Sequence, residues 1–423
     1  MDKAYITLSV FITAYALFII LPARRSIVAV AGSLLLVLAG AISPKDAFLS
    51  VNWNVMGIFV GTLVVADIFM ESKVPAYLAE IIVDKAKNTA WAILSICMLT
   101  GFISAFVENV ATVLIVAPIA ISLARKLKIN PTNMMIAIAI SSNLQGTATL
   151  IGDPPSMLLG GFAKMNFMDF FIYKGRPSIF FAVECGAAAS FCVLYFIFRR
   201  HKEKTVLVPI EKVRSWFPTV VLVTLIFLLA ASSFFDAGFS CLAGELCIAA
   251  AFISIMWERF INKKSILKGL RKLDWDTTAF LMGVFILVGS VTATGWVEKA
   301  AEFLSGAVGT NLFMGYTVIV VVSVILSAFI DNVPFLAAML PVAISMSVRM
   351  SVDPSLFLFG LLIGASLGGN ITPIGASANI VACGILKKEG YPVKFTHFMK
   401  LGIPFTIVAV GAAYVFLWLV WGK

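Results

Sequence analysis

The sequence matches itself at an offset of 223 residues, and no other feature constrains its fold as strongly. The stretch "SAFVENVATVLIVAPIAIS", which starts at Ser104, aligns with "SAFIDNVPFLAAMLPVAIS", which starts at Ser327. Further along, "LQGTATLIGDPPS" from Leu144 aligns without a gap with "LGGNITPIGASAN" from Leu367. The match predicts two homologous units in which equivalent segments have equivalent structures.

The repeat divides the chain into a first unit, residues 1–205, and a second unit, residues 206–423. The charged segment 199–214, "RRHKEKTVLVPIEKVR", joins them. Nearer the start of each unit the offset is 222, where Trp53 aligns with Trp275. The similarity therefore extends well beyond the two matched motifs.

The apolar runs between the charged clusters are long enough to cross a membrane. Hydrophobic residues make up 61% of the chain, charged residues make up 13%, and the mean hydropathy is +1.01. A helix of about 20 apolar residues spans the hydrocarbon core of about 30 Å. The first run, residues 5–21, lacks a basic leader and a small-residue cleavage site, so we expect a retained span. The sequence predicts an all-α polytopic protein in the lipid bilayer of the cell membrane (plasma membrane or bacterial inner membrane).

Each unit is predicted to hold five crossings and one re-entrant hairpin. The hairpin follows from length, because its two apolar arms would cover only about 20–26 Å as helices. The fourth crossing would be about 50 Å long as one helix, and its glycines and prolines are expected to break it. In the first unit the crossings are 5–22, 27–43, 53–70, 131–163 and 177–198, the hairpin is 91–124, and an interfacial helix is 73–88.

An odd number of crossings per unit places the second unit upside down relative to the first. With both termini outside, 24 of the 32 Lys and Arg residues lie in loops on the inner side, Arg24 and Arg25 among them. This distribution follows the positive-inside rule. It accounts for the net charge of +10 without a nucleic-acid partner.

The broken helices carry polar residues at matching places in both units. Unpaired backbone groups at membrane depth cost several kcal/mol each unless they are buried in protein or line a cavity. Paired interruptions in inverted repeats indicate a transporter binding site, whereas the alternative is that the glycines only allow close helix packing. The expected site residues are Asn143, Gln145, Gly146, Thr147, Thr149, Gly152 and Asp153 in the first break, and Gly369, Asn370, Thr372, Gly375, Ser377 and Asn379 in the second.

The predicted hairpin tips each carry an acid and an amide inside an apolar run, Glu108–Asn109 and Asp331–Asn332. An acid at the bilayer centre costs about 2.5–3.5 kcal/mol, so it is a functional candidate. It can carry a proton or bind Na⁺, and the alternative is a permanent pair with a lysine or arginine of another span. The expected Na⁺ ligands form two mirrored shells, one of Asn109, Asn143 and Gly146 with Thr147, the other of Asn332, Gly369 and Asn370 with Thr372.

Other polar residues carry weaker predictions. Asp153 either contacts an ion or caps the second half-helix. Asp67 and Glu184 have local pairing as the alternative to a functional role. The six cysteines lack C-x-x-C spacing and are expected to be buried thiols, and both histidines lie in basic loops. No cofactor is therefore expected beyond a coupling ion, H⁺ or Na⁺.

Three motifs resemble those of the ion transporter superfamily: "SAFVENVATVLIVAPI", "GTATLIGDPPS" and "GASLGGNITPIGASANIVACGI". That superfamily includes arsenical pump membrane proteins, NhaD-type Na⁺/H⁺ antiporters, citrate transporters and dicarboxylate/Na⁺ symporters. The likeness is strongest to the branch of the arsenical pumps and the pink-eyed dilution P protein, and it covers nearly the whole chain. The motifs are specific for the superfamily and much less so for substrate.

The resemblance implies an elevator-type fold and a homodimer. In such a fold residues 91–163 and 312–386 together form a moving transport domain, and the remaining spans form the scaffold. Arsenical pumps of this family can use a separate ATPase subunit, so such a partner is one expectation. The dicarboxylate members carry Ser-Asn-Thr at both tips, where this chain has Glu108–Asn109–Val110 and Asp331–Asn332–Val333. This departure favours a carboxylate-based, proton-coupled site.

The sequence thus predicts a secondary active transporter and not an enzyme. The first choice of substrate is a small anion or oxyacid of the arsenite or antimonite type, coupled to H⁺ or Na⁺. Na⁺/H⁺ antiport and cation-coupled transport of a citrate-like di- or tricarboxylate are alternatives, and an anion channel is a further class. No nucleotide-binding fingerprint or nucleophile–base pair stands out in the sequence.

Overall fold

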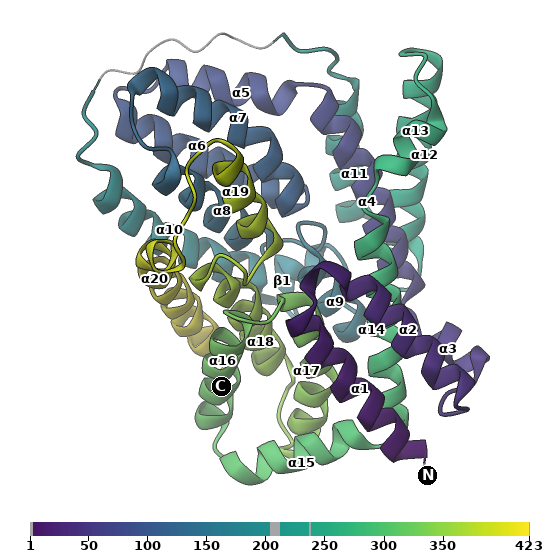
Figure 1. The fold of residues 1–423 in the computed structure, drawn as a ribbon. Helices are drawn as coiled ribbons and strands as arrows, with labels where there is room; N and C mark the ends of the chain where they lie inside the picture. The colour runs from purple at the N-terminus through teal and green to yellow at the C-terminus, as the bar shows by residue number, and fades with distance from the viewer. Residues whose placement is uncertain (1–2, 204–211, 237, 423) are drawn as a thin grey trace.

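The computed structural model describes residues 3–203, 212–236 and 238–422, and most of this chain is helical (Figure 1). The prediction of an all-α fold is confirmed. Part of the predicted joining segment, 199–214, lies outside the described residues. Helices of the first unit are α1 (Lys3–Ile20), η1 (Pro22–Arg24), α2 (Arg25–Leu38), α3 (Pro44–Ser50), α4 (Trp53–Glu71), α5 (Val74–Asp84), α6 (Thr89–Ser104), α7 (Asn109–Leu127), α8 (Thr132–Gly146), α9 (Pro154–Ala163), η2 (Met168–Phe170) and α10 (Ile179–Phe198).

The second unit has the same order of long helices. A short antiparallel ribbon, β1 (Ile172–Tyr173) with β2 (Arg176–Pro177), precedes α10 in the first unit. Helices of the second unit are α11 (Phe217–Ser232), α12 (Leu242–Phe260), α13 (Ile266–Lys272), α14 (Trp275–Ala293), α15 (Trp296–Val308), α16 (Leu312–Ser327), α17 (Asn332–Arg349), α18 (Ser355–Gly368), η3 (Gly369–Ile371), α19 (Ser377–Lys388) and α20 (Phe395–Trp421).

Equivalent helices of the two units begin at equivalent side chains. The Asn88 side chain accepts a hydrogen bond from the backbone N–H of Trp91 at 3.0 Å and caps α6. Asn311, 223 residues later, caps α16 in the same way through Met314 at 3.0 Å. An N-cap amide satisfies a backbone donor that has no partner within the helix. The sequence repeat therefore recurs in the secondary structure, while the inverted orientation of the second unit stays a prediction.

One group of helices combines the early parts of both units and lies on the right of Figure 1. In this group α4 packs against α11 and α12, and α14 packs against α1 and α2. A Cβ atom on Gly61 would lie 2.4 Å from the carbonyl carbon of Cys247, and one on Gly283 would lie 2.8 Å from that of Ala29. Small residues at such contacts let membrane helices approach closely.

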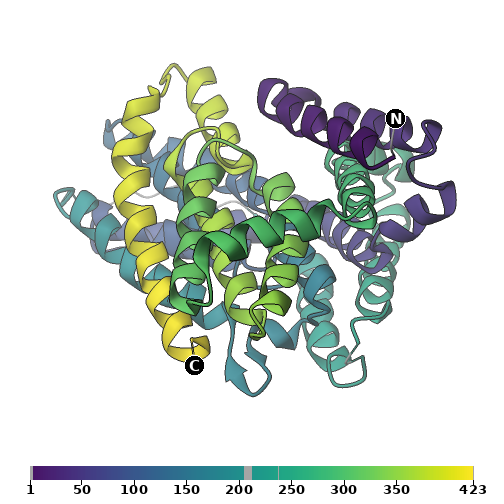
Figure 2. The same cartoon turned by 90° about the horizontal axis from the view of Figure 1, so that it is seen from below.

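The other group contains the hairpins and the broken helices. Here α6 packs on α8, α16 packs on α18, and α10 packs along α20. Figure 2 shows α20, in yellow, on the side of the molecule away from the purple α1 and α2. Both α10 and α20 also contact the broken helices, through α8 and α18 respectively. The candidate site residues therefore come mainly from this second group.

Seven described helices are long and apolar enough to cross a membrane by length and composition, or up to eight if the bent pair α15–α16 counts as one span. The sequence predicted ten crossings. Five of these seven helices, α1, α4, α10, α14 and α20, are predicted crossings, whereas α7 and α17 are second arms of the predicted hairpins. Several other predicted crossings are shorter as helices: α2 has 14 residues and α11 has 16. The prediction that both arms of the first hairpin are too short to cross is wrong for the second arm, because α7 runs for 19 residues from Asn109 to Leu127.

Ion pairs between loops agree with the predicted assignment of loops to two faces. Lys174 pairs with Asp353 at 2.6 Å, and both lie in loops predicted to be outside. Arg125 pairs with Glu389, and both lie in segments predicted to be inside. These contacts relate loops to one another, and the absolute orientation of the chain stays a prediction.

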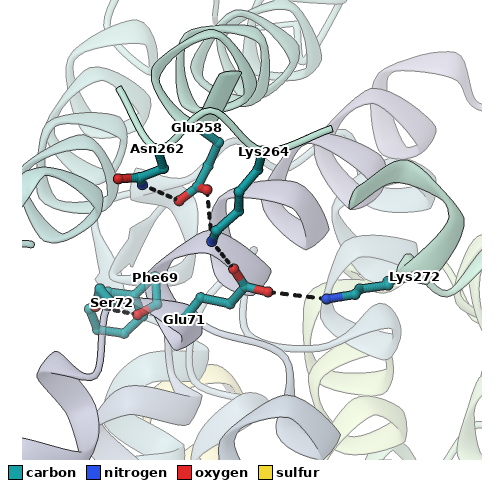
Figure 3. Close-up of polar contacts among 7 residues, drawn as sticks. All are labelled: Phe69, Glu71, Ser72, Glu258, Asn262, Lys264 and Lys272. Carbon is teal, nitrogen blue, oxygen red and sulfur yellow. Dashed lines mark hydrogen bonds and ion pairs between the residues drawn. The ribbon is translucent and has the colours of Figure 1, made fainter. Parts of the chain in front are cut away.

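A charged cluster joins the end of α4 to the turn between α12 and α13 (Figure 3). Glu71 lies between Lys264 and Lys272, and Lys264 also contacts Glu258 at 2.8 Å. Partial burial acts to lower the pKa of Lys264, but its bonds to Glu258 and Glu71 outweigh this effect and raise the pKa overall. All four residues lie on the predicted inner side.

Candidate ion and substrate site

Each broken helix brings two stretches of backbone into contact at glycines. A Cβ atom on Gly152 would lie 2.3 Å from the carbonyl oxygen of Gly146, and one on Gly146 would lie 2.1 Å from Oδ1 of Asn109. In the second unit, Cβ atoms on Gly369 and Gly375 would each lie 2.6 Å from the other residue's carbonyl oxygen. Real Cβ atoms do not approach oxygen this closely, so only glycine fits these four positions.

A threonine fastens each break to the neighbouring hairpin. The Thr149 hydroxyl donates to the carbonyl oxygen of Ala105, and the Thr372 hydroxyl donates to that of Ala328. The two threonines are 223 residues apart in the sequence, and so are the two alanines. Thr147 instead donates within its own helix, to the carbonyl oxygen of Asn143 at 3.2 Å. Hairpin and broken helix are thus held together in the same way in both units.

Asparagine side chains connect the two breaks directly. The Asn143 amide donates to Oδ1 of Asn370 and to Oδ1 of Asn379, each at 2.9 Å. Oδ1 of Asn143 accepts from Asn109 at 3.4 Å, and Oδ1 of Asn109 accepts from Ser104 at 2.7 Å. The structure thus brings the two polar breaks into direct contact, and Asn143 joins the two mirrored shells. That these residues bind an ion or a substrate stays a prediction.

The carbonyl groups freed by the second break have partners within the protein. The Asn379 amide donates to the carbonyl oxygens of Gly369 and Thr372, each at 3.0 Å. A buried backbone acceptor without a partner is costly, and here an asparagine side chain satisfies two of them. A cation that binds these carbonyls must therefore compete with Asn379.

The two hairpin tips begin helices with their acids. Oε2 of Glu108 accepts from the N–H of Ala111 at 2.9 Å and caps α7, whereas Oδ1 of Asp331 accepts from Val333 at 3.1 Å and caps α17. Asp331 also forms an ion pair with Arg25. For Asp331 the structure therefore shows the alternative to a free acid, an ion pair with an arginine of another helix.

Arg25 and Asp274 are charged residues of this site that sequence reasoning missed, and Arg25 shows why. It was assigned with Arg24 to a charged inner loop, but it is the first residue of α2 and its side chain is only 18% exposed. Its guanidinium donates to Thr277 at 3.2 Å and lies over the ring of Phe280, 4.9 Å from the centroid. In the sequence, Arg25 is distinguished only by its place directly before an apolar run. An arginine in an ordinary loop next to a membrane span has the same place.

Asp153 caps a helix, which is one of its two predicted roles, and contact with an ion stays a prediction. Its Oδ1 accepts from the N–H of Ser156 at 2.9 Å and caps α9, and the side chain also lines the cavity described next. The residue is 2% exposed. Capping and contact with a solute are therefore compatible at this carboxylate.

A cavity of about 70 Å³ lies where tips and breaks meet. Its described lining carries three carboxylates, Glu108, Asp153 and Asp274, and one guanidinium, that of Arg25. Further lining residues that the sequence predicted are Asn109, Asn143, Asn332 and Ser377. The structure thus encloses one small, acid-rich space with side chains from both units.

Gln145 lies apart from this cavity. Its side chain faces a separate, largely apolar cavity of about 700 Å³ between α6, α8 and α10, together with Glu184. Asp67 lines a third cavity beside Glu71. The structure therefore does not bring these three residues to the shared site, and within the described chain we find no cluster of three or more His, Cys, Asp or Glu suited to a metal ion.

Comparison with known proteins identifies relatives along the whole chain. The chain is 30% identical over 434 residues to a 46 kDa membrane protein of Mycobacterium leprae, with 98% of each chain covered. It is 28% identical to an uncharacterized transporter of Mycobacterium bovis, again with 98% of each covered. It is 26% identical to the P protein of Sus scrofa, where the match covers 97% of this chain and 59% of that protein.

A solved structure shares the fold. The YdaH transporter of Alcanivorax borkumensis superimposes with a TM-score of 0.62 at 13% identity, and the match covers 99% of this chain and 98% of that one. At this identity the likeness concerns the fold alone. The sequence model described as "Citrate transporter" matches residues 15–357. Since that match covers most of a chain with a transporter's fold and paired polar breaks, the protein belongs to the citrate transporter (CitMHS) family of the ion transporter superfamily.

Proposed function

We propose that the protein is a secondary active transporter that couples the movement of a small oxygen-rich solute to H⁺ or Na⁺. The observation that carries this proposal is the cavity lined by both hairpin tips and both polar breaks. Its three carboxylates outnumber its single guanidinium, so a negatively charged solute would meet repulsion unless a cation entered with it. This charge balance is what a cation-coupled site requires.

Two substrate classes follow from the relatives and the site. A small oxyacid or anion of the arsenite or antimonite type agrees with the motifs and with a cavity of about 70 Å³. A citrate-type carboxylate agrees with the family's description, and it requires the cavity to widen because one water molecule already takes about 30 Å³ of liquid.

The packing of the helices supports a division into a moving part and a static part. Residues 91–163 and 312–386 are proposed to move as a transport domain against α1–α4 and α11–α14. Because α10 and α20 pack on the broken helices, we assign these two helices to the moving part as well. A homodimer formed through the remaining helices, in a plasma or bacterial inner membrane with both termini outside, completes the proposal.

The test is flux through purified protein in proteoliposomes, without an ATPase. Arsenite, citrate, succinate and Na⁺ are offered one at a time under imposed pH and Na⁺ gradients. Accumulation of a probe against its own gradient supports the proposal. Unitary currents far above the roughly 10³ turnovers per second typical of fast protein catalysts would instead identify a channel, and exchange of Na⁺ for H⁺ alone would identify an antiporter.

A further inference from the structure

Asp331 uses its two carboxylate oxygens on two different groups of helices. Oδ1 caps α17 through Val333, and Oδ2 pairs with the guanidinium of Arg25 on α2. The two side chains are 25% and 18% exposed, so the pair is shielded. Arg25 lines the cavity, and so do Asn332 and Val333, the two residues that follow Asp331. The tip of the second hairpin is therefore tied to the α1–α4 and α11–α14 group by an ion pair, and by the Tyr15 hydroxyl on α1, which donates to the carbonyl oxygen of Pro334 at 2.8 Å.

Arg25 is held in place without help from Asp331. Thr277 accepts one of its N–H groups at 3.2 Å and itself donates to Asp274 at 2.6 Å. Phe280 lies beneath the guanidinium at 4.9 Å. All three residues belong to the start of α14 or cap it. The guanidinium therefore stays in position at the cavity when its anionic partner changes.

The contact of α12 with α4 is built like that of α2 with α14. Oδ1 of Asn54 on α4 accepts from the N–H of Gly244 on α12 at 2.7 Å. At the aligned position of α14, Oδ1 of Asp276 accepts from the hydroxyl of Ser26 on α2. Gly244 and Ser26 thus occupy equivalent places in the two contacts.

The residue before each of these places differs between the units. Arg25 precedes Ser26, whereas Ala243, which is 5% exposed, precedes Gly244. The first hairpin tip accordingly has no guanidinium from α12, and Glu108 forms no ion pair among the described residues. Only the second tip is fastened by charge.

We propose that Arg25 is a specificity-determining residue that exchanges Asp331 for an oxyanion group of the substrate, and that this exchange releases the tip of α17. The proposal rests on the proposed transport function and narrows its substrate to solutes that carry a negative charge. A planar guanidinium binds carboxylates and related oxyanions through two parallel hydrogen bonds. An uncharged oxyacid cannot replace the carboxylate without leaving Arg25 unpaired.

The exchange also links the substrate to the coupling ion. Once the substrate takes Arg25, the shielded Asp331 carboxylate keeps its bond to the N–H of Val333 but has no cationic partner, and a shielded charge without a counter-charge is unfavourable. A proton or Na⁺ at Asp331 removes that penalty. Substrate and cation therefore bind together, and in their absence the Arg25–Asp331 pair holds the hairpin.

The test compares binding with transport. Purified full-length protein is assayed for the shift of its unfolding temperature by citrate, succinate or arsenite, which is uncharged at neutral pH, and for flux of the same probes in proteoliposomes. The variants are Arg25→Gln, Arg25→Lys and Asp331→Asn. The matched control is Arg24→Gln, at the exposed neighbouring arginine.

We expect citrate or succinate, and not arsenite, to stabilise the wild-type protein. Arg25→Gln should weaken binding of the anion about 10–100-fold, as the loss of charged hydrogen bonds of about 1.5–3 kcal/mol implies. Arg25→Lys should weaken binding of the anion less than Arg25→Gln does. Lysine keeps the positive charge but cannot form the two parallel hydrogen bonds of a guanidinium. Asp331→Asn should tighten binding several-fold, because it removes the competing carboxylate, while Arg24→Gln leaves it unchanged.

Equal weakening by Arg25→Gln and Asp331→Asn would indicate a purely structural ion pair and overturn the proposal. Stabilisation by arsenite alone, or by no anion, would overturn it too. If Arg25→Gln does not fold, the opposite effects of Arg25→Lys and Asp331→Asn decide. The proposed function fails by a different result, the absence of accumulation of any probe under any gradient, whether or not an anion binds.

Discussion

At Gly146 a single added methyl group would enter the amide of Asn109, which itself contacts Asn143 in the network between the units. Such crowding in a packed interior costs about 1–3 kcal/mol. The polar network can relieve it only by giving up the Asn109–Asn143 contact. We therefore expect transport to be sensitive to the presence of a Cβ atom at residue 146.

We therefore expect Gly146→Ala to lower flux at least about tenfold while lowering the unfolding temperature by a few degrees. The control is Gly411→Ala on α20, where a Cβ atom would meet no neighbour within 4 Å. Flux and thermal unfolding of both purified variants provide the measurement. Equal flux in the two variants would contradict the role of this close contact.

Glu108 provides the second prediction at the residue scale. It is the tip acid without an ion pair among the described residues, and it lines the cavity. Glu108→Gln removes the charge and keeps the size and the helix cap. Gradient-driven accumulation should fall, because one of the two tip acids that can bind the coupling cation is lost, while exchange of substrate across the membrane continues. Accumulation at the wild-type level would assign the coupling elsewhere.

Among the elements, the helix pairs α4–α12 and α2–α14 depend on small residues. A Cβ atom on Gly61 would meet the rigid backbone of Cys247 at 2.4 Å. By contrast, Gly306 lies within α15 with no neighbour within 4 Å of an added Cβ atom. A glycine-to-alanine substitution is therefore crowded at Gly61 and has free space at Gly306.

Gly61→Ala is expected to destabilise the protein by about 1–3 kcal/mol through overpacking. Gly306→Ala is expected to stabilise it by about 0.5–1 kcal/mol, because alanine loses less backbone entropy in a helix. Thermal unfolding in detergent compares the two. A loss of stability of the same size in both would mean that the close contact of α4 with α12 contributes nothing.

For the whole molecule, the sequence repeat predicted more of the site than of its surroundings. The positions of the breaks and of the tips followed from matched polar residues in apolar runs, whereas the contact of Asn143 with Asn370 appears only in the structure. The Arg25–Asp331 pair could not follow, because 306 residues separate its partners and a basic residue before a span is ordinary at an inner loop. The direction of Gln145 could not follow either, since neighbouring helical residues point to different sides.

The sidedness of the molecule gives the last prediction. Lys174, paired with Asp353, and Lys128, in the turn after α7, belong to opposite predicted faces. In a background without the six cysteines, Lys174→Cys should react with an impermeant thiol reagent on intact cells, and Lys128→Cys only after permeabilisation. Labelling of both from one side would refute the predicted crossing at residues 131–163, which separates the two lysines.

The joining of the units at one cavity has a consequence for biosynthesis. Residues 3–203 supply Arg25, Glu108 and Asp153 to the lining, and Asp274, Asn332 and Ser377 come from residues 212–422. While the chain emerges from the ribosome, the polar break of the first unit enters the membrane before its partners exist. The Asn143 amide therefore lacks its partners Asn370 and Asn379 until the second unit is synthesised. Until then we expect water or the insertion machinery to supply its hydrogen bonds.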